Sequence, residues 1–235
     1  MHTVSSLFDL KHTMAGAYLE GFSYPWEALD GITGLITRLG ESLGDSYEEV
    51  KPSVWVHRTA KVASSAFLNG PCIIGAGTEV RQGAFIRGSA LIGEGCVVGN
   101  SVEVKNAILF DGVQVPHYNY VGDSILGYKA HMGAGSVTSN IKSDKSNVVV
   151  RGTETVDTGR RKLGAMVGDF AEVGCNAVLN PGTVIGRRAT VYPLSCVRGT
   201  VPEGHIFKNT GETVKKIITV AMCYIKIKII AAQSP

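Results

Sequence analysis

Three side chains that suit the binding and reaction of an anionic small molecule stand in the middle of the chain: Arg87, Lys105 and His117. Two cationic side chains favour a phosphate group, and an imidazole, whose pKa lies near neutrality, favours proton transfer. His117 belongs to the unusual segment Val115-Pro-His-Tyr-Asn-Tyr-Val-Gly-Asp123. These residue types indicate an anion-binding site with a general base, provided that the fold brings them together.

A six-residue repeat runs through most of the chain and predicts that fold. A large apolar residue recurs at every sixth position, a small residue usually stands four places later, and glycine often follows the apolar residue directly. The repeat positions are Val56, Val62, Leu68, Ile74, Val80, Ile86, Ile92, Val98, Val104 and Phe110, then Val167, Val173, Leu179, Ile185, Val191 and Val197. A period of six matches neither an amphipathic helix nor a half-buried strand. It is typical of an all-β solenoid, here a left-handed parallel β-helix of hexapeptide repeats.

The length of one coil sets where the basic residues lie. Three hexads make one coil, and Arg87 precedes Lys105 by eighteen residues. We therefore expect them one above the other on one face, about 4.8 Å apart along the axis. Two unpaired cations this close repel each other unless an anion lies between them, with Glu103 compensating in part. The segment around His117 interrupts the repeat, so we expect it to leave the coil and line its outside.

Several of these segments together resemble a known family. The runs Gly99-Asn-Ser-Val-Glu-Val-Lys105, Pro116-His-Tyr-Asn-Tyr-Val-Gly-Asp123 and Met132-Gly-Ala-Gly135 are similar to the acetyltransferase domain of the bifunctional glucosamine-1-phosphate N-acetyltransferase / N-acetylglucosamine-1-phosphate uridyltransferases. The run from Asp157 to Asp169 is closer to archaeal-type sugar-1-phosphate nucleotidylyltransferases that carry the same domain. The resemblance covers roughly residues 54 to 208.

The resemblance implies a hexapeptide-repeat N-acetyltransferase that acts on an amino-sugar 1-phosphate, with acetyl-CoA as co-substrate, no metal, and His117 as the catalytic base. It also implies the ligands of both substrates. Those of the sugar phosphate are Arg87, Glu103, Lys105, Tyr120, His131, Asn140 and Lys145, and those of acetyl-CoA are Ala134, Cys175, Pro193 and Lys208. Three positions depart from the family: His131 replaces an asparagine, Cys175 replaces a serine, and Lys208 is the cation nearest to a missing arginine for the 3′-phosphate of CoA.

Outside the repeat the pattern changes. Apolar residues from Ala28 to Leu43 follow helical spacing, and an earlier helix is expected around Leu7 to Leu19. We interpret residues 1–50 as a helical hairpin that caps the open end of the solenoid or packs on a neighbouring subunit. Residues 51–208 form the predicted β-helix, and residues 209–235 form a tail, for which helix and strand both stay open.

Composition narrows the class of protein. The net charge of +3, from 23 Lys and Arg against 20 Asp and Glu, is too small and too scattered for a nucleic-acid surface. The apolar stretch from Ile217 to Ala232 contains two lysines and is shorter than the ~20 residues of a membrane span, so we expect no membrane partner. Five cysteines without a CxxC pair or a leader predict free thiols and a cytoplasmic protein.

Three functions stay open. The first is amino-sugar N-acetyl transfer in nucleotide-sugar biosynthesis by a homotrimer, because the base and ligands form only half a cleft and cyclic symmetry supplies the rest. The second is a non-catalytic trimeric module that binds sugar phosphates or partner subunits. The third is a γ-class carbonic anhydrase, disfavoured because its zinc ligands need a histidine spacing that His117 and His131 lack. Nucleotidyl transfer is not expected, since no glycine-rich basic loop precedes the repeat.

Overall fold

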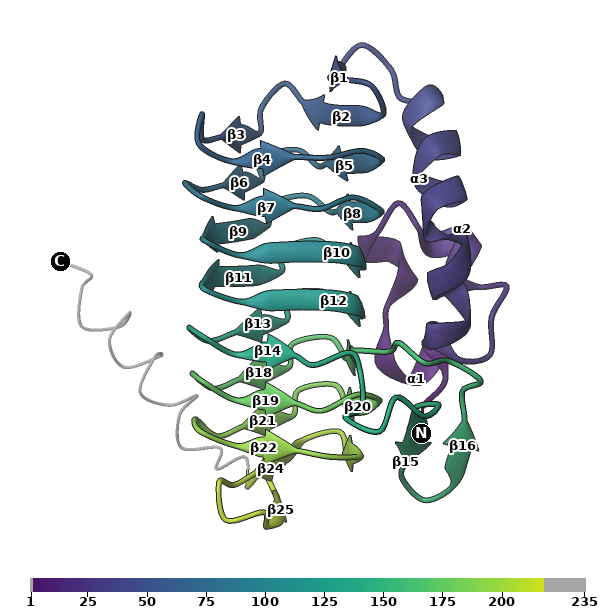
Figure 1. Ribbon diagram of the computed structural model, residues 1–235, viewed down its shortest axis with the longest axis vertical. Coiled ribbons are helices and arrows are strands. Elements are labelled where there is room, and N and C mark those ends of the chain that lie inside the picture. The colour runs from purple at the N-terminus through teal and green to yellow at the C-terminus, as the bar shows by residue number, and fades with distance from the viewer. Residues whose placement is uncertain (1, 218–235) are drawn as a thin grey trace, which may run out of the picture.

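The computed structural model describes residues 2–217 and shows a parallel β-solenoid (Figure 1). Equivalent residues of successive coils pair in parallel: Val56 pairs with Ile74, which pairs with Ile92. Strands on the near side of the view run from left to right, those on the far side run back, and the chain descends, so the coil is left-handed. The predicted left-handed parallel β-helix is confirmed.

Three flat faces make up the prism. Face 1 consists of β2 (Val54–His57), β5 (Cys72–Ile74), β8 (Ala90–Ile92), β17 (Ala165–Val167), β20 (Thr183–Ile185) and β23 (Thr200–Val201). Face 2 consists of β3 (Lys61–Val62), β6 (Glu79–Val80), β9 (Val97–Asn100), β11 (Gln114–His117), β13 (His131–Met132), β18 (Glu172–Val173), β21 (Thr190–Val191) and β24 (His205–Phe207). Face 3 consists of β4 (Phe67–Leu68), β7 (Phe85–Ile86), β14 (Val137–Thr138), β19 (Val178–Leu179) and β22 (Cys196–Val197). Two long strands, β10 (Glu103–Leu109) and β12 (Tyr120–Leu126), continue from face 3 around a corner onto face 1.

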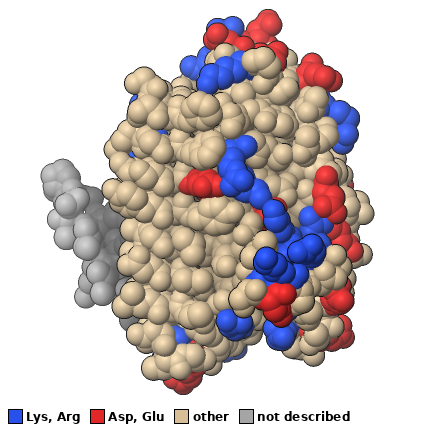
Figure 2. Space-filling model, viewed as in Figure 1, with Lys and Arg blue, Asp and Glu red and all other residues tan. Residues whose placement is uncertain are grey.

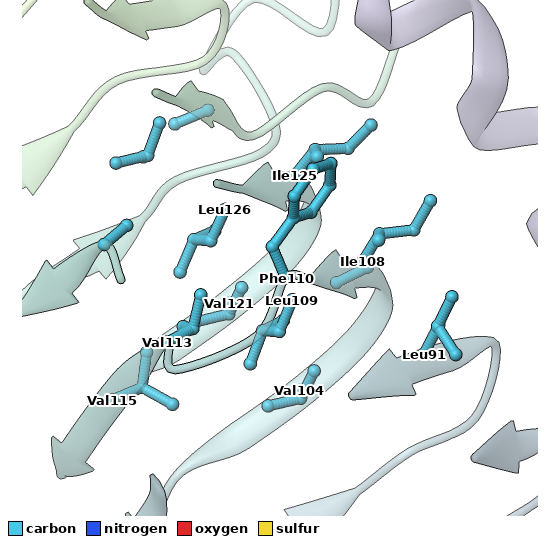
Figure 3. Packing of buried hydrophobic residues seen from close by; sticks show 14 of the residues in the cluster. Leu91, Val104, Ile108, Leu109, Phe110, Val113, Val115, Val121, Ile125 and Leu126 are labelled. Carbon is cyan, nitrogen blue, oxygen red and sulfur yellow. The ribbon is translucent and has the colours of Figure 1, made fainter. Parts of the chain in front are cut away.

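The interior of the prism is filled by the apolar repeat residues. Val104, Val115 and Val121 are fully buried and lie close together inside neighbouring coils (Figure 3). Small residues at the corners, such as Ala84 and Cys96, are buried too and let the three faces approach one another. Burial of one aliphatic side chain contributes about 1.5–3 kcal/mol, so the stacked interior stabilises a fold in which few large rings are present.

The repeat loses one residue at two adjacent corners between faces 3 and 1, a change that the period of six does not predict. Leu109, rather than Phe110, pairs with the repeat position of the coil before it. Five residues instead of six therefore lead from Val104 to Leu109, and again from Val121 to Leu126. The prediction for Phe110 is wrong because the chain turns more tightly here.

The segment from Val115 to Asp123 stays within the coil, so the prediction that it leaves the solenoid is wrong. It forms the end of β11 and the start of β12, with Asn119 at the corner place that small residues occupy elsewhere. The buried Asn119 amide donates hydrogen bonds to the carbonyls of Gly133 and Ser136, at 2.8 and 3.0 Å. A polar side chain fits inside the corner because these bonds replace the ones it makes with water.

The N-terminal segment covers face 1 (Figure 1). It contains α1 (Val4–Leu7), η1 (Leu10–His12), α2 (Gly16–Leu19), η2 (Pro25–Gly31) and α3 (Ile32–Glu41). Most outer side chains of face 1 are apolar and buried, and five of them are at most 1% exposed: Ile73, Leu91, Ile108, Ile125 and Met166. Both surfaces of face 1 are therefore apolar, which is why a covering segment is required there.

Two expectations for this segment are corrected by the structure. It folds as short helical pieces instead of a two-helix hairpin, because turns and Pro25 divide it and α3 alone reaches ten residues within the described chain. It lies along the side of its own solenoid, not on the open end, because α3 packs on β5, β8 and β10. Gly40 permits this approach, since an added Cβ there would lie 2.3 Å from the ring of Trp55.

An excursion of residues 139–164 separates β14 from β17. Within it, β15 (Val149–Arg151) and β16 (Thr155–Asp157) form an antiparallel hairpin. Arg160 donates to both carboxylate oxygens of Asp30 at 2.7 Å each. This bidentate pair joins the excursion to the N-terminal segment beside face 1.

The ends of the solenoid are closed by antiparallel strands. β1 (Tyr47–Lys51) pairs with β2, and β25 (Thr213–Lys215) pairs with β24. Residues 218–235, most of the predicted tail, lie outside the described residues. Between residues 2 and 217 the chain contains no helix with the length and apolar character needed to cross a membrane.

Candidate functional site

A cluster of polar side chains lies on the outer surface of face 3, where β10 and β12 approach the corner to face 1. Glu103 of β10 lies beside Tyr120 of β12 in the ladder. Arg87 follows β7 directly, and its backbone N–H donates to Val104, which places it beside Lys105. Arg87 and Lys105 thus stand at equivalent positions of neighbouring coils, where the period of six predicts them.

Each of these two cations is bonded to its own carboxylate. Arg87 Nη1 lies 2.9 Å from Glu103 Oε1, and Lys105 Nζ lies 3.4 Å from Asp123 Oδ2. Glu103, which we expected to compensate the stacked cations in part, pairs with Arg87 because the long arginine side chain reaches a carboxylate in the next coil. The Arg87 side chain is 51% exposed, whereas that of Asp123 is only 6% exposed. The first pair is therefore open to exchange with a ligand, and the second is built into the corner.

Asp123 binds two further side chains. Asn106 Nδ2 donates to Oδ1 of the carboxylate at 2.8 Å, and Asn140 Nδ2 donates to Oδ2 at 2.5 Å. Asn140 Nδ2 also donates to the hydroxyl of Tyr120 at 3.1 Å. Lys105, Tyr120 and Asn140 therefore meet around one buried carboxylate, although they come from two neighbouring coils and the excursion.

Tyr120 lies folded over the backbone of its own strand. Burial raises the pKa of Tyr120, and the nearby charges of Asp123 and Glu103 raise it further. The phenol thus keeps its proton at neutral pH and can donate a hydrogen bond. The position under its hydroxyl must be glycine, since an added Cβ at Gly122 would lie 2.4 Å from the phenol oxygen.

His117 ends β11 at the corner between faces 2 and 3. It pairs with Asn100 of the coil before, and its backbone N–H donates to Asn119 Oδ1 at 3.1 Å. The side chain is exposed, and within residues 2–217 the imidazole has no hydrogen-bonding partner. The buried Asn119 amide fixes the backbone at His117 while the ring extends into solvent.

A column of small and ring-shaped side chains continues below His117 along the same corner. Ala134, Cys175 and Pro193 take the place of His117 in the three following coils. The residue after each of them donates its backbone N–H to the carbonyl of the column residue above, at 2.8–3.0 Å. Lys208 stands one coil further on, where the pairing of Val191 with Phe207 aligns it with Tyr192, one residue before the column position, and its Nζ lies 2.9 Å from Glu212. Three of the four predicted acetyl-CoA ligands therefore follow one line that begins at His117, and Lys208 lies beside the end of that line.

Two predicted sugar ligands lie away from the cluster within one chain. His131 is on face 2, where its Nδ1 lies 2.8 Å from Glu172 Oε2. Lys145 is exposed in the excursion, and its backbone N–H donates to Lys142. Of the predicted sugar ligands after β13, Asn140 is the one whose side chain binds the Asp123 carboxylate.

The charges on this side of the molecule form a band. Figure 2 shows Lys and Arg side chains that run from the region of β7 and β10 toward the excursion, with an acidic group beside the upper end. The part of the same view to the left of the band is almost entirely uncharged. Exposed apolar side chains near the corner of faces 2 and 3 include Tyr118, Val178 and Leu194.

Comparison with known proteins supports the resemblance that the motifs carry. A family model described as the GMPPB C-terminal domain matches residues 68–158. The chain is 33% identical over 189 residues to a "Bifunctional sugar-1-phosphate nucleotidylyltransferase/acetyltransferase" of Sulfurisphaera tokodaii, covering 78% of this chain and 47% of that protein. This chain is related to the bifunctional sugar-1-phosphate enzymes. The resemblance inferred from the sequence is confirmed.

Other relatives of the bifunctional type give the same picture. A "Bifunctional protein GlmU" of Methanococcus aeolicus is 28% identical over 201 residues, covering 78% of this chain and 45% of the relative. The chain thus spans about half the length of these curated relatives.

Among solved structures, PerB from Caulobacter crescentus is 20% identical with a TM-score of 0.38, covering 80% of this chain and 67% of that one. AntD, an N-acyltransferase from Bacillus cereus, is 13% identical with a TM-score of 0.42, covering 77% of this chain and 88% of that one.

The structure adds two residues that the motifs left without a role, Asn106 and Asp123. Both stand at the shortened corners and have a positive φ, 45° and 48°. Each of these corners is one residue shorter than the repeat. This shortening is present in the sequence and could have marked both residues, but only once the strand pairing shows which residues are equivalent in successive coils. Among the described residues no group of three His, Cys, Asp or Glu side chains is arranged to hold a metal ion.

Proposed function

We propose that residues 51–208 carry an acetyl-CoA-dependent N-acetyltransferase that acts on an amino-sugar 1-phosphate, a step of nucleotide-sugar biosynthesis, with His117 as the general base. The observation that carries this proposal is the order of groups along face 3. His117 stands at the corner where the chain enters the face, Tyr120 begins β12 three residues later, and Arg87 and Lys105 flank the far edge. A base and a set of phosphate ligands therefore share one surface.

The chemistry needs one base that gains and returns a proton. The uncharged amine of the sugar attacks the thioester carbonyl carbon, a C–N bond forms, and His117 takes the proton from nitrogen. Collapse of the tetrahedral intermediate breaks the C–S bond, and the protonated imidazole returns the proton to the departing thiolate. The products are the N-acetylated sugar phosphate and free CoA, and His117 is regenerated. Its exposure leaves the imidazole accessible to an incoming amine.

The phosphate replaces Glu103 at Arg87 in this proposal. An exposed ion pair contributes little in water, so a phosphate dianion, which accepts two hydrogen bonds from the guanidinium, competes well for it. Lys105 and the protonated phenol of Tyr120 supply the remaining donors from the next two coils. Displaced Glu103 stays close to the sugar hydroxyls.

Acetyl-CoA lies along the column below His117. Ala134, Cys175 and Pro193 are short side chains on an exposed corner, and this surface fits the narrow pantetheine arm of CoA. Cys175 forms part of the groove wall. Lys208 stands beside the far end of the column, where it meets a phosphate of the nucleotide part once Glu212 is exchanged.

A homotrimer completes the cleft. His131 and Lys145 lie away from the phosphate cluster in one chain, and face 1 is covered by the chain's own N-terminal segment. Faces 2 and 3 are left for contacts with neighbours, and the uncharged area in Figure 2 lies on this side. Cyclic symmetry then places face 2 of one subunit against face 3 of the next.

A thiol-release assay tests the activity directly. Purified protein is incubated with acetyl-CoA and one sugar in each of several parallel reactions. The sugars are glucosamine 1-phosphate, galactosamine 1-phosphate and the corresponding free amino sugars. Mass spectrometry then gives the masses of the products. Release of CoA with an added acetyl mass on a 1-phosphate supports the proposal. The proposal is contradicted if none of the amino-sugar 1-phosphates causes release of CoA, or if the free amino sugars are turned over equally well.

The non-catalytic module is the second candidate, favoured by one observation. The imidazole of His117 has no side chain within residues 2–217 to orient it, and both cations of the cluster are already neutralised. Titration calorimetry separates the two functions: a module binds the sugar 1-phosphate and releases no CoA in the presence of acetyl-CoA.

A further inference from the structure

Asp123 stands at a backbone position that does not by itself call for an acidic residue. Its φ of 48° lies in the left-handed region, as does the φ of 45° at Asn106, the equivalent residue one coil earlier. At the corresponding corner of the coil before, the chain has Gly88 and Ser89, also with positive φ. Glycine or asparagine meets the backbone requirement at least as well as aspartate. The carboxylate therefore has a reason other than the turn.

Burying the charged Asp123 carboxylate costs folding free energy unless donors within the protein replace its hydrogen bonds to water. The side chain is 6% exposed, and a buried charge is tolerated only with good partners. Three donors supply them: Lys105 Nζ, Asn106 Nδ2 and Asn140 Nδ2. An ionised carboxylate accepts hydrogen bonds and donates none. Both asparagines must therefore turn their NH2 groups toward Asp123.

The orientation of Asn140 determines what its neighbours can offer. Its Nδ2 uses both hydrogens, one toward Asp123 and one toward the hydroxyl of Tyr120. Its Oδ1 then points away and has no hydrogen-bonding partner in the described part of the chain. Because the Tyr120 oxygen accepts from Asn140, the phenol hydrogen is free to be donated elsewhere. The cluster thus presents one acceptor, Asn140 Oδ1, and one donor, the Tyr120 hydroxyl.

We infer that Asp123 is a positioning residue that sets this donor and acceptor polarity for the sugar phosphate. It directs the Tyr120 hydroxyl to the phosphate as a donor and the Asn140 carbonyl oxygen to a sugar hydroxyl or ammonium as an acceptor. It also holds the Lys105 ammonium at the edge of the phosphate site. The inference rests on the proposed function, since it assigns the same site its polar specificity.

The substitution Asp123→Asn tests the inference with almost no change in shape. A neutral amide at this place presents an NH2 group to either Asn106 or Asn140, so one of these two amides has to turn, and Lys105 loses its charged partner. We expect KM for the amino-sugar 1-phosphate to rise by about 10- to 100-fold. KM for acetyl-CoA should stay within about twofold, because the column below His117 is not touched.

A double-mutant cycle shows whether Asp123 acts through Asn140. Asn140→Ala is expected to raise the same KM, and the double variant should be little worse than the more severe single variant, because both remove one pathway. Fully additive effects overturn the inference. If Asp123→Asn fails to fold, Asn140→Ala carries the test alone, and an unchanged KM for the sugar phosphate overturns it. The matched control is Asp45→Asn, an exposed residue near α3, which should leave both KM values unchanged.

The possible failures are distinguishable. A wild-type protein that neither acetylates nor binds any amino-sugar 1-phosphate overturns the proposed function and this inference with it. A wild-type protein that turns over the sugar phosphate, together with an Asp123→Asn variant of the same KM, overturns this inference alone. A variant with a lower kcat, a higher KM for both substrates and a lower melting temperature shows that the Asp123 carboxylate is merely structural. This result also overturns the inference.

Discussion

Arg87 and Lys105 stand one above the other in adjacent coils, yet the first is paired with a half-buried glutamate and the second with a buried aspartate. The local charge of the free site is therefore balanced, and a ligand phosphate has to exchange with a carboxylate to bind. Glu103 is the side chain that can leave, because it belongs to the more exposed pair. This arrangement leads directly to the first expected result.

Arg87→Ala should raise KM for a 1-phosphorylated amino sugar by about 10-fold or more, because a charge-assisted hydrogen bond to phosphate is lost. KM for acetyl-CoA should hardly change. Steady-state kinetics with each substrate varied in turn provide the measurement. Arg81→Ala is the matched control, since Arg81 forms a 2.9 Å pair with Glu79 on face 2. Equal loss of both substrates would show that the Arg87 pair is structural.

His117→Ala should lower kcat by about 100- to 10,000-fold, the usual cost of losing a general base. The fold should persist, because the side chain is exposed and no interior contact is removed. Turnover numbers and circular dichroism measure the two quantities. His205→Ala, a change on β24 at the other end of the solenoid, is the control. An unchanged kcat would remove His117 from the mechanism and favour the non-catalytic module.

Light scattering coupled to size exclusion should give the mass of a trimer at micromolar concentration. Leu194→Asp should weaken the trimer, because Leu194 is 71% exposed at the corner of faces 2 and 3, where a buried charge at an interface is costly. Its φ of 60° suits aspartate at least as well as leucine, so the single chain should still fold. Val50→Asp, an exposed change on β1, should leave the trimer intact. A fully active wild-type monomer would contradict the proposed assembly.

Asp30→Asn should destabilise the protein at neutral pH by at most about 1 kcal/mol, because Arg160, whose side chain is 15% exposed, loses its charged partner, but water screens the Asp30 carboxylate, which is 80% exposed. The hydrogen bond from Arg160 lowers the pKa of Asp30 below its ordinary value of 3.8. A lowered pKa in the folded state means stability that is present above pH 3.8 and is lost as the pH falls further. Urea unfolding at pH 7 and pH 3 measures this.

The difference between wild type and Asp30→Asn should therefore shrink at the lower pH, where the wild-type carboxyl becomes protonated. Asp157→Asn, in the neighbouring hairpin strand β16, is an exposed control for the same measurement. An equal difference at both pH values would show that the Arg160 contact acts through packing and not through charge.

The six-residue period alone determined the β-helix and the relative position of Arg87 and Lys105. Both follow from local geometry, because a hexad places one side chain inside the prism whatever the distant residues are. The stacking of Arg87 on Lys105 needs only the count of residues per coil. The alignment of His117, Ala134 and Cys175 at one corner does not follow from that count, because a shortened corner and the excursion of residues 139–164 lie between them.

The tertiary structure alone decided the contacts of Asp123, the place of His131 on face 2 and the position of the N-terminal segment. The corners at Asn106 and Asp123 are one residue short, and a lost residue shifts the register without changing the residue types that a period is read from. Long side chains such as Arg87 reach partners in another coil, so their pairing depends on distances that the order of residues does not state. The covering of face 1 likewise depends on apolar side chains on its outer surface, which become an interface only when the coils have stacked.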